Sequence, residues 1–255
     1  MTLGFYTAAL GRKYEQFIAP YITSTLTTYP DATCELLVLD SERWKQSHRS
    51  LCNKLREVFP DRFLIHGVGF PWKKQGLMPH TVRFVTRPHR RESDLLYIGD
   101  VDIIVSTPGI VEFHTKAMKQ LKLPYSNVIR QGENRLTGLH VVRTADYFRK
   151  ITPQAMQVAI RHWGKGNDER LLYHMCKRFI GLPKKRVPRP VFGVHASPQR
   201  PLFRPDGCHW CIEQHLETHQ SLLQSEEWKT LFPLFDPRFK QKMLKVDNWI
   251  RANTE

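Results

Sequence analysis

The sequence predicts an α/β protein: a sheet flanked by helices, followed by a helical C-terminal extension. Short apolar, β-prone runs alternate with stretches in which apolar residues recur every three or four positions. This alternation is typical of a parallel sheet with helices on both faces, whose strands end along one ligand-binding edge. The chain has 255 residues, of which 41% are hydrophobic, so it is long and apolar enough for one such domain.

The first part of the chain predicts three strands and two helices. In the helix expected at 14–27, apolar residues lie at spacings of three and four. Pro60 and Asp61 end the second helix, at 49–59. The strands are expected at residues 2–8, 34–39 and 62–65.

The rest of the chain continues the alternation and then changes character. Asn167 is a good N-cap for a helix that runs to Phe179. Six prolines between residues 182 and 205 predict a long irregular connection. Further helices are expected at 81–88, 115–121 and 145–151, strands at 95–98 and 137–142, and an aromatic-rich helical segment at 216–255.

The composition restricts the surroundings in which the chain works. No apolar stretch reaches the roughly 20 residues that span a bilayer, and no signal sequence opens the chain. Five cysteines, an odd number, indicate reduced thiols. We therefore expect a cytoplasmic protein, and its net charge of +15 favours an anionic neighbour such as a nucleotide diphosphate, an acidic polysaccharide, an anionic membrane surface or nucleic acid.

The strongest local signal is a pair of carboxylates, Asp100 and Asp102, directly after an apolar strand. If the strand continued through them, both would project from one face as close like charges, which is costly without a cation. Oxygen ligands of this kind suit Mg²⁺ or Mn²⁺, which also bind diphosphates. The simpler alternative is a surface turn that carries two acids.

The run Tyr97-Ile98-Gly99-Asp100-Val101-Asp102 resembles the DxD motif of GT-A glycosyltransferases, above all the retaining glycogenin-like and lipopolysaccharide galactosyltransferase-like group. It differs from that group by the extra Gly99. Weaker similarities follow in the family's order over residues 2–215. The resemblance implies a Rossmann-like mixed sheet flanked by helices in residues 1–215, with 216–255 as a helical extension packed on it.

The same resemblance implies how a nucleotide-sugar donor is held. Asp102 would bind the metal directly, and Asp100 would bind the metal or the ribose. Gly138 would let the donor sugar approach closely. Further donor contacts are expected from Thr7, Ala8 and Tyr14 in the first strand and nucleotide-binding loop, from Arg83 before the DxD strand, and from Lys184 near the diphosphate. For Tyr14, packing in the core is an equal alternative.

A second acidic pair opens the helix after Asn167. The segment resembles the acid-bearing helix start of glycogenin-like enzymes and of the blood-group and α-galactosyl transferases. That likeness puts Glu169 near the anomeric carbon, as a nucleophile or an electrostatic stabiliser, and gives Asp168 hydrogen bonds to donor-sugar hydroxyls. The alternative is that both acids only complement the helix dipole.

Histidines near the end of the proline-rich segment offer two kinds of metal site. By resemblance, His209 would complete the site of Asp100 and Asp102. A rival arrangement is the spacing C-x2-C-x3-H-x3-H, which zinc can use. Its members are Cys208, Cys211, His215 and His219, for which packing and surface exposure are a further alternative.

These observations favour a metal-dependent glycosyltransferase, which moves a sugar from a nucleotide-diphosphate sugar to a glycan or other hydroxyl acceptor. The resemblance further implies a retaining reaction and a place in polysaccharide biosynthesis. A basic nucleic-acid-binding module is an alternative, because basic runs lie at 87–91 and 184–189. No reader motif accompanies them, so nucleic acid is not the expected partner. A nucleotidyltransferase on a related fold is the other alternative, but no Gly-rich phosphate loop follows the first strand.

Overall fold

The computed structural model contains a six-stranded mixed sheet in the order β3-β2-β1-β4-β7-β6. It describes residues 1–69, 73–90, 92–130, 133–187, 192–197 and 215–254. The strands are β1 (Leu3–Ala9), β2 (Thr33–Val38), β3 (Phe63–Gly67), β4 (Leu95–Ile98), β6 (Tyr125–Ser126) and β7 (His140–Arg143).

The strand directions correct the expectation of a parallel sheet. β1 to β4 are parallel, whereas β7 is antiparallel to β4 and β6 is antiparallel to β7. The mixed α/β fold class is therefore confirmed. The alternation of strands and helices predicts which segments form strands, but it does not determine the direction of each strand. Direction depends on the neighbour with which a strand pairs, and β6 and β7 pair antiparallel.

A second, two-stranded antiparallel sheet joins β5 (Ile103–Val105) to β8 (Gly193–His195). The predicted irregular connection at 182–205 thus contains a strand. Gly193 allows this pairing, because a Cβ there would lie 2.0 Å from the carbonyl oxygen of Ile104. The pairing brings a proline-rich segment beside the turn that follows β4.

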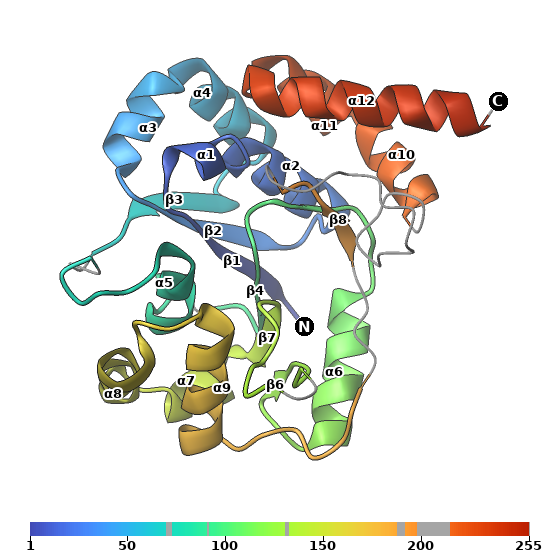
Figure 1. Cartoon of the computed structure of the whole chain (residues 1–255). Helices are drawn as coiled ribbons and strands as arrows, with labels where there is room; N and C mark the ends of the chain where they lie inside the picture. Colours follow the sequence, from blue (N-terminus) through green and yellow to red (C-terminus); the bar gives the residue numbers. More distant parts are fainter. Residues whose placement is uncertain (70–72, 91, 131–132, 188–191, 198–214, 255) are drawn as a thin grey trace.

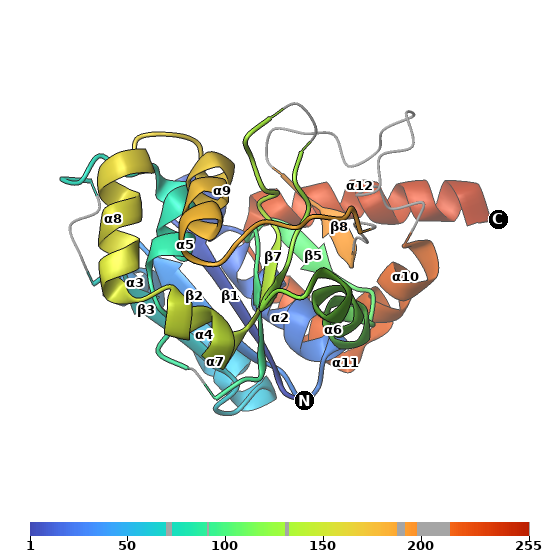
Figure 2. The same ribbon diagram turned by 90° about the horizontal axis from the view of Figure 1, so that it is seen from below.

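Helices cover both faces of the large sheet (Figure 1). On one face lie α5, α7, α8 and α9, and on the other α2, α4 and α10 to α12, as the turned view also shows (Figure 2). The helices are α1 (Arg12–Glu15), α2 (Ile18–Thr28), α3 (Ser41–Ser47), α4 (Arg49–Val58), α5 (Val82–Val85), α6 (Ile110–Leu121), α7 (Thr144–Lys150), α8 (Pro153–Trp163), α9 (Asp168–Phe179), α10 (Leu216–Gln224), α11 (Glu226–Leu231) and α12 (Pro237–Thr254), with 3-10 turns η1 (Pro79–Thr81) and η3 (Phe232–Leu234).

Several elements differ from their predicted bounds. The helix expected at 14–27 is interrupted at Phe17, between α1 and α2. The helix expected at 81–88 ends at Val85, and Thr86 is already extended. The strand expected at 137–142 begins only at His140. The elements α3, α8, β5, β6 and β8 were not expected from the sequence.

The C-terminal helices share the core of the sheet. Phe17 and Phe239 meet edge to face, with ring centroids 5.9 Å apart. Trp228 and Phe235 are buried in the same apolar cluster. The prediction that this segment is helical is confirmed, and the domain boundary at residue 215 stays a prediction.

The state of the cysteines bears on the expected surroundings of the chain. Cys34, Cys52 and Cys176 are free, and burial raises the pKa of each thiol, that of Cys34 to about 12. Such thiols are protonated and unreactive at neutral pH.

Within the described part of the chain, no helix is both long and apolar enough to cross a membrane.

Buried histidines should make the fold sensitive to acid. Burial lowers the pKa of His114 and His140 to about 3 and that of His219 to about 4. Between these values and the unfolded pKa of about 6.5, the unfolded chain binds more protons, so stability falls as pH falls. We expect each histidine to contribute about 1 kcal/mol per pH unit to that slope. Urea unfolding from pH 7 to pH 5 should show the slope, and His114→Gln should make it shallower; an equal slope would contradict the prediction.

Candidate active site

The two carboxylates lie in the turn between β4 and β5. The strand does not continue through them: β4 ends at Ile98, and β5 begins at Ile103, so both acids lie in a turn. Asp100 is half-exposed, whereas Asp102 is buried. The main chain of Asp102 is fixed by Ala196, whose N–H donates to the Asp102 carbonyl over 2.7 Å. This turn lies at the carboxyl end of β4, where parallel sheets place their ligands.

A histidine joins the two carboxylates. His195, the last residue of β8, places its Nε2 atom 3.1 Å from Oδ1 of Asp102. One ligand atom from each of Asp100, Asp102 and His195 lies within 4.8 Å of the others. The expected third ligand, His209, lies outside the described residues. Sequence reasoning missed His195; the available signal was the short apolar run from Phe192 to Val194 that ends at it.

Arg83 ties this group to the second acidic pair. Its Nη2 atom lies 2.8 Å from Oδ1 of Asp100 and 3.0 Å from Oδ2 of Asp168. The side chain is only 3% exposed. Burial alone would lower the pKa of the guanidinium, but Asp100 and Asp168 outweigh it and raise that pKa. Arg83 thus remains a cation that bridges β4 and α9.

The side chain of Glu169 is bound by partners outside its own helix. Its Oε1 atom accepts hydrogen bonds from the backbone N–H of Gly138 over 3.1 Å and from Nη2 of Arg130 over 2.8 Å. The N-cap role at this helix belongs to Asn167, whose side chain accepts from the N–H of Glu169. The carboxylate of Glu169 therefore lies next to Gly138 and Arg130.

Gly138 lies where the two acidic pairs approach one another. A Cβ on Gly138 would be 3.2 Å from Nη2 of Arg83, 3.7 Å from Oδ2 of Asp100 and 3.9 Å from Oε1 of Glu169. The structure therefore brings together five of the residues predicted from sequence, from four separate segments of the chain: Arg83, Asp100, Gly138, Asp168 and Glu169.

A basic cavity adjoins Glu169. It has a volume of about 400 Å³ and is lined by residues 128–130, 133–134 and 183–186. Lys184 lines it together with Arg130, the partner of Glu169. Lys184 is thus near the acidic cluster, and its contact with a diphosphate stays a prediction.

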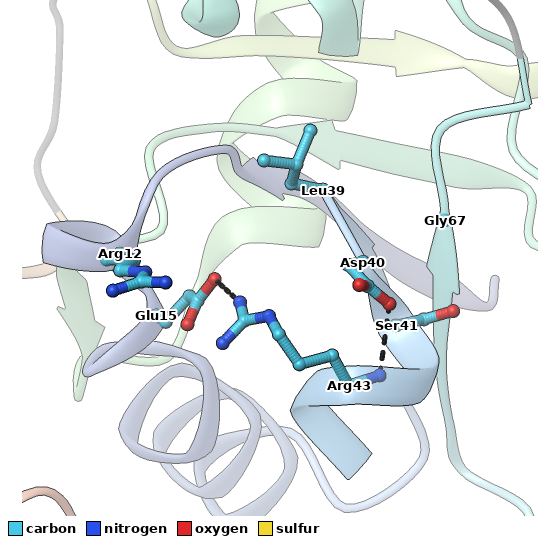
Figure 3. Close-up of a pocket in the computed structure, with 7 residues that line it drawn as sticks. All are labelled: Arg12, Glu15, Leu39, Asp40, Ser41, Arg43 and Gly67. Carbon is cyan, nitrogen blue, oxygen red and sulfur yellow. Dashed lines mark hydrogen bonds and ion pairs between the residues drawn. The ribbon is translucent and has the colours of Figure 1, made fainter. Parts of the chain in front are cut away.

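A larger cavity, of about 540 Å³, lies at the carboxyl ends of β2 and β3 and beside α1 (Figure 3). Arg43 crosses it to contact Glu15, while Asp40 caps α3 by accepting from the N–H of Arg43. The cavity shares no lining residue with the acidic cluster, although both lie on the same edge of the sheet. Its lining residues are Arg12, Glu15, Leu39, Asp40, Ser41, Arg43 and Gly67.

The three donor contacts predicted in the first strand and loop are less exposed than expected. Thr7 is fully buried, and its hydroxyl donates to the carbonyl of Gly99 over 2.8 Å. Ala8 is 9% exposed. Tyr14 is partly buried and packs against the core, with Nζ of Lys13 5.1 Å from its ring centroid. Thr7 therefore positions the glycine before Asp100, and direct donor contacts of these residues stay predictions.

A lysine from the last helix also reaches this region, and no sequence pattern predicted it. Nζ of Lys242 donates to the carbonyl of Ala196 over 2.8 Å and to that of Ser197. Burial lowers the pKa of this ammonium, and the Asp102 carboxylate opposes that shift. Lys242 thus holds the chain directly after His195.

The arrangement of strands and helices is that of GT-A glycosyltransferases. An active-site mutant of LgtC matches with a TM-score of 0.52 at 15% identity, over 91% of this chain and 100% of that chain. A second structure, galactosyltransferase LgtC with donor and acceptor sugar analogs, matches with a TM-score of 0.46 at 15% identity, over 90% and 99% of the two chains.

Another similar structure is a putative nucleotide-diphospho-sugar transferase from Desulfovibrio desulfuricans G20. It has a TM-score of 0.44 and 11% identity, over 98% of this chain and 96% of that chain. No protein-family model matches the sequence, and no curated protein matches it. The match to the LgtC mutant, with a TM-score of 0.52 at 15% identity, shows a shared fold.

Gly138 offers a direct test of the site. The methyl group of Gly138→Ala would occupy the space between Arg83, Asp100 and Glu169. We expect sugar-transfer turnover to fall by about 10-fold or more, because small displacements of reacting groups are costly. The melting temperature should change little, since the Cβ meets no backbone atom within 4 Å among its nearest neighbours. Gly69→Ala is the control, because a Cβ there meets nothing within 4 Å; equal turnover in the two variants would contradict the prediction.

Proposed function

We propose that this protein is a metal-dependent glycosyltransferase that moves a sugar from a nucleotide-diphosphate sugar to a hydroxyl acceptor. The observation that carries the proposal is the convergence of Asp100, Asp102 and His195 after β4, joined through Arg83 to Asp168. The next residue, Glu169, accepts a hydrogen bond from the N–H of Gly138, the glycine beside Arg83 and Asp100. This convergence lies at the ligand-binding edge of a GT-A fold.

The residues present fit a divalent metal. Asp100, Asp102 and His195 offer two carboxylate oxygens and one imidazole nitrogen within 4.8 Å of one another. Oxygen ligands suit Mn²⁺ or Mg²⁺, and the imidazole favours Mn²⁺ of the two. A bound metal would supply Lewis-acid stabilisation of the departing nucleotide diphosphate. The protein holds Asp102 in place through the main chain of Ala196, next to the strand that carries His195.

The donor is best placed along the carboxyl edge of the sheet. The nucleoside would occupy the cavity beside Asp40 and Arg43, and the diphosphate would extend toward Asp100 and Asp102. The sugar would then lie over Gly138, the position at which a side chain is absent. Asp168 would bind the sugar hydroxyls, and Glu169 would face the anomeric carbon.

A negative charge at Glu169 suits a retaining reaction. The transition state at the anomeric carbon has oxocarbenium character, and a carboxylate nearby stabilises it or attacks it. Hydrogen bonds from Gly138 and Arg130 fix the carboxylate before the donor arrives. The acceptor would enter from the basic cavity that contains Arg130 and Lys184.

The surroundings of the reaction follow from charge. A net charge of +15 suits an anionic glycan acceptor or an anionic membrane surface. We propose that the enzyme acts in polysaccharide biosynthesis, peripheral to the cytoplasmic face of an anionic membrane.

The test is a panel of nucleotide sugars with the purified chain. Donor hydrolysis and thermal stabilisation are measured for each nucleotide sugar with Mn²⁺, with Mg²⁺ and with a chelator. We expect one donor to be hydrolysed and to raise the melting temperature only when metal is present, because a ligand bound to the folded state stabilises it. If no nucleotide sugar or nucleoside diphosphate stabilises the chain under any of these conditions, the proposed function is wrong.

A further inference from the structure

A second cluster of metal-ligating side chains lies away from the active site, on β2, β3 and the segment before β4. Glu35 belongs to β2 and His66 to β3, the strand at the edge of the sheet. Glu35 pairs with Leu64, so His66, two residues further, projects from the same face. His89 comes from the segment between α5 and β4 and lies against both.

The three ligand atoms surround one point. Nε2 of His66 lies 2.8 Å from Oε1 of Glu35, and Nδ1 of His89 lies 3.6 Å from the same oxygen. The two nitrogens are 3.2 Å apart. Ligands bound about 2.0–2.1 Å from a tetrahedral zinc ion stand roughly 3.3 Å from one another. The cluster therefore already has the spacing of three corners of such a site.

The carboxylate is held in a fixed orientation. Oε1 of Glu35 accepts from the N–H of His89 over 2.8 Å, and Oε2 accepts from the N–H of Arg90 over 2.9 Å. The side chain of Glu35 is 3% exposed, so its two oxygens are withdrawn from water and oriented by these two amides. A buried carboxylate is stabilised by a cationic partner.

Both ring nitrogens of His66 face an oxygen. Nδ1 lies 3.2 Å from the carbonyl of Gly67, and Nε2 lies 2.8 Å from Oε1 of Glu35. When the ring proton is on Nδ1, Nε2 presents a lone pair toward the Glu35 carboxylate and His89. Lone pairs that converge in this way repel one another unless a proton or a metal ion lies between them.

We propose that Glu35, His66 and His89 bind a transition-metal ion of the zinc class. Two imidazole nitrogens and one carboxylate oxygen suit Zn²⁺ or Co²⁺ rather than Mg²⁺ or Ca²⁺. The side chain of His89 is 65% exposed, so the ion would be reached from solvent, with water as its fourth ligand. The ion would fasten the segment before β4, the strand that leads to Asp100, to the edge of the sheet.

This site is independent of the proposed transferase chemistry, and a difference measurement tests it. Bound Zn²⁺ is counted by equilibrium dialysis and elemental analysis for wild type, His89→Ala and His162→Ala. His162 is an exposed histidine in α8 and serves as the matched control. We expect His89→Ala to bind one equivalent less than both wild type and the control. Zinc bound by other residues contributes equally to each variant, so it does not affect the difference in bound zinc between them.

Co²⁺ absorption adds a readout of geometry. Wild type should show visible bands of a tetrahedral or five-coordinate ion, and these bands should be lost in His89→Ala and in His89→Gln, which guards against a local folding defect in the alanine variant. If wild type and both His89 variants bind equal amounts of Zn²⁺ and give the same Co²⁺ spectrum, the cluster is a hydrogen-bonded ion pair with a protonated His66, and the proposed metal site is wrong.

Discussion

Replacing Glu169 with glutamine is expected to lower the turnover of sugar transfer by on the order of 10²-fold or more, because a preorganised charge beside a developing cation is lost. The side chain keeps its size and can still accept from the N–H of Gly138. Donor binding should survive, since the proposed metal ligands Asp100, Asp102 and His195 lie on other segments. Turnover at saturating donor, measured beside the melting temperature, checks the prediction.

The alternative for Glu169 is a helix-capping role, and a matched variant separates the two. Glu226 is a first-turn acid of α11 whose side chain is 88% exposed. Glu226→Gln should change only stability, by about 0.3–1 kcal/mol at most. If Glu169→Gln behaves in the same way, with a small loss of stability and normal turnover, Glu169 is structural and the retaining mechanism loses its support.

Replacing Asp102 with asparagine is expected to abolish the thermal stabilisation that a nucleoside diphosphate gives in the presence of Mn²⁺. At a ligand concentration of 100 times Kd that stabilisation is about 2.7 kcal/mol in wild type. Turnover should fall by on the order of 10²–10³-fold, because the charge that holds the metal is lost. The fold without metal should persist, since asparagine keeps an oxygen toward Nε2 of His195. Differential scanning fluorimetry with and without Mn²⁺ measures the first effect.

Asp146 provides the control for this substitution. It lies in the first turn of α7 and pairs only with Arg149 on the same helix in the described structure. Asp146→Asn should leave both the Mn²⁺-dependent stabilisation and turnover at wild-type values. Undiminished stabilisation in Asp102→Asn would remove Asp102 from the metal site.

Local sequence was enough to identify the first part of this site. An apolar run followed by Asp100 and Asp102 predicts a buried strand that delivers two acids to the edge of a sheet, and β4 does this. Asn167 predicts the start of α9, because an N-cap depends only on its own helix. With that start fixed, Asp168 and Glu169 occupy the first turn. These features rest on neighbours within a few residues, which the sequence displays directly.

Tertiary structure decided which distant residues complete the site. His195 reaches Asp102 only because β8 pairs with β5, and that pairing requires a glycine at position 193. Lys242 arrives on the last helix of the chain. Strand pairing and helix docking are non-local: their free energy comes from buried area and hydrogen bonds between segments that are far apart in sequence. For that reason the sequence determined the strand, the acids and the helix cap, whereas the antiparallel β7, the position of His195 and the cluster of Glu35, His66 and His89 were settled only when the chain folded.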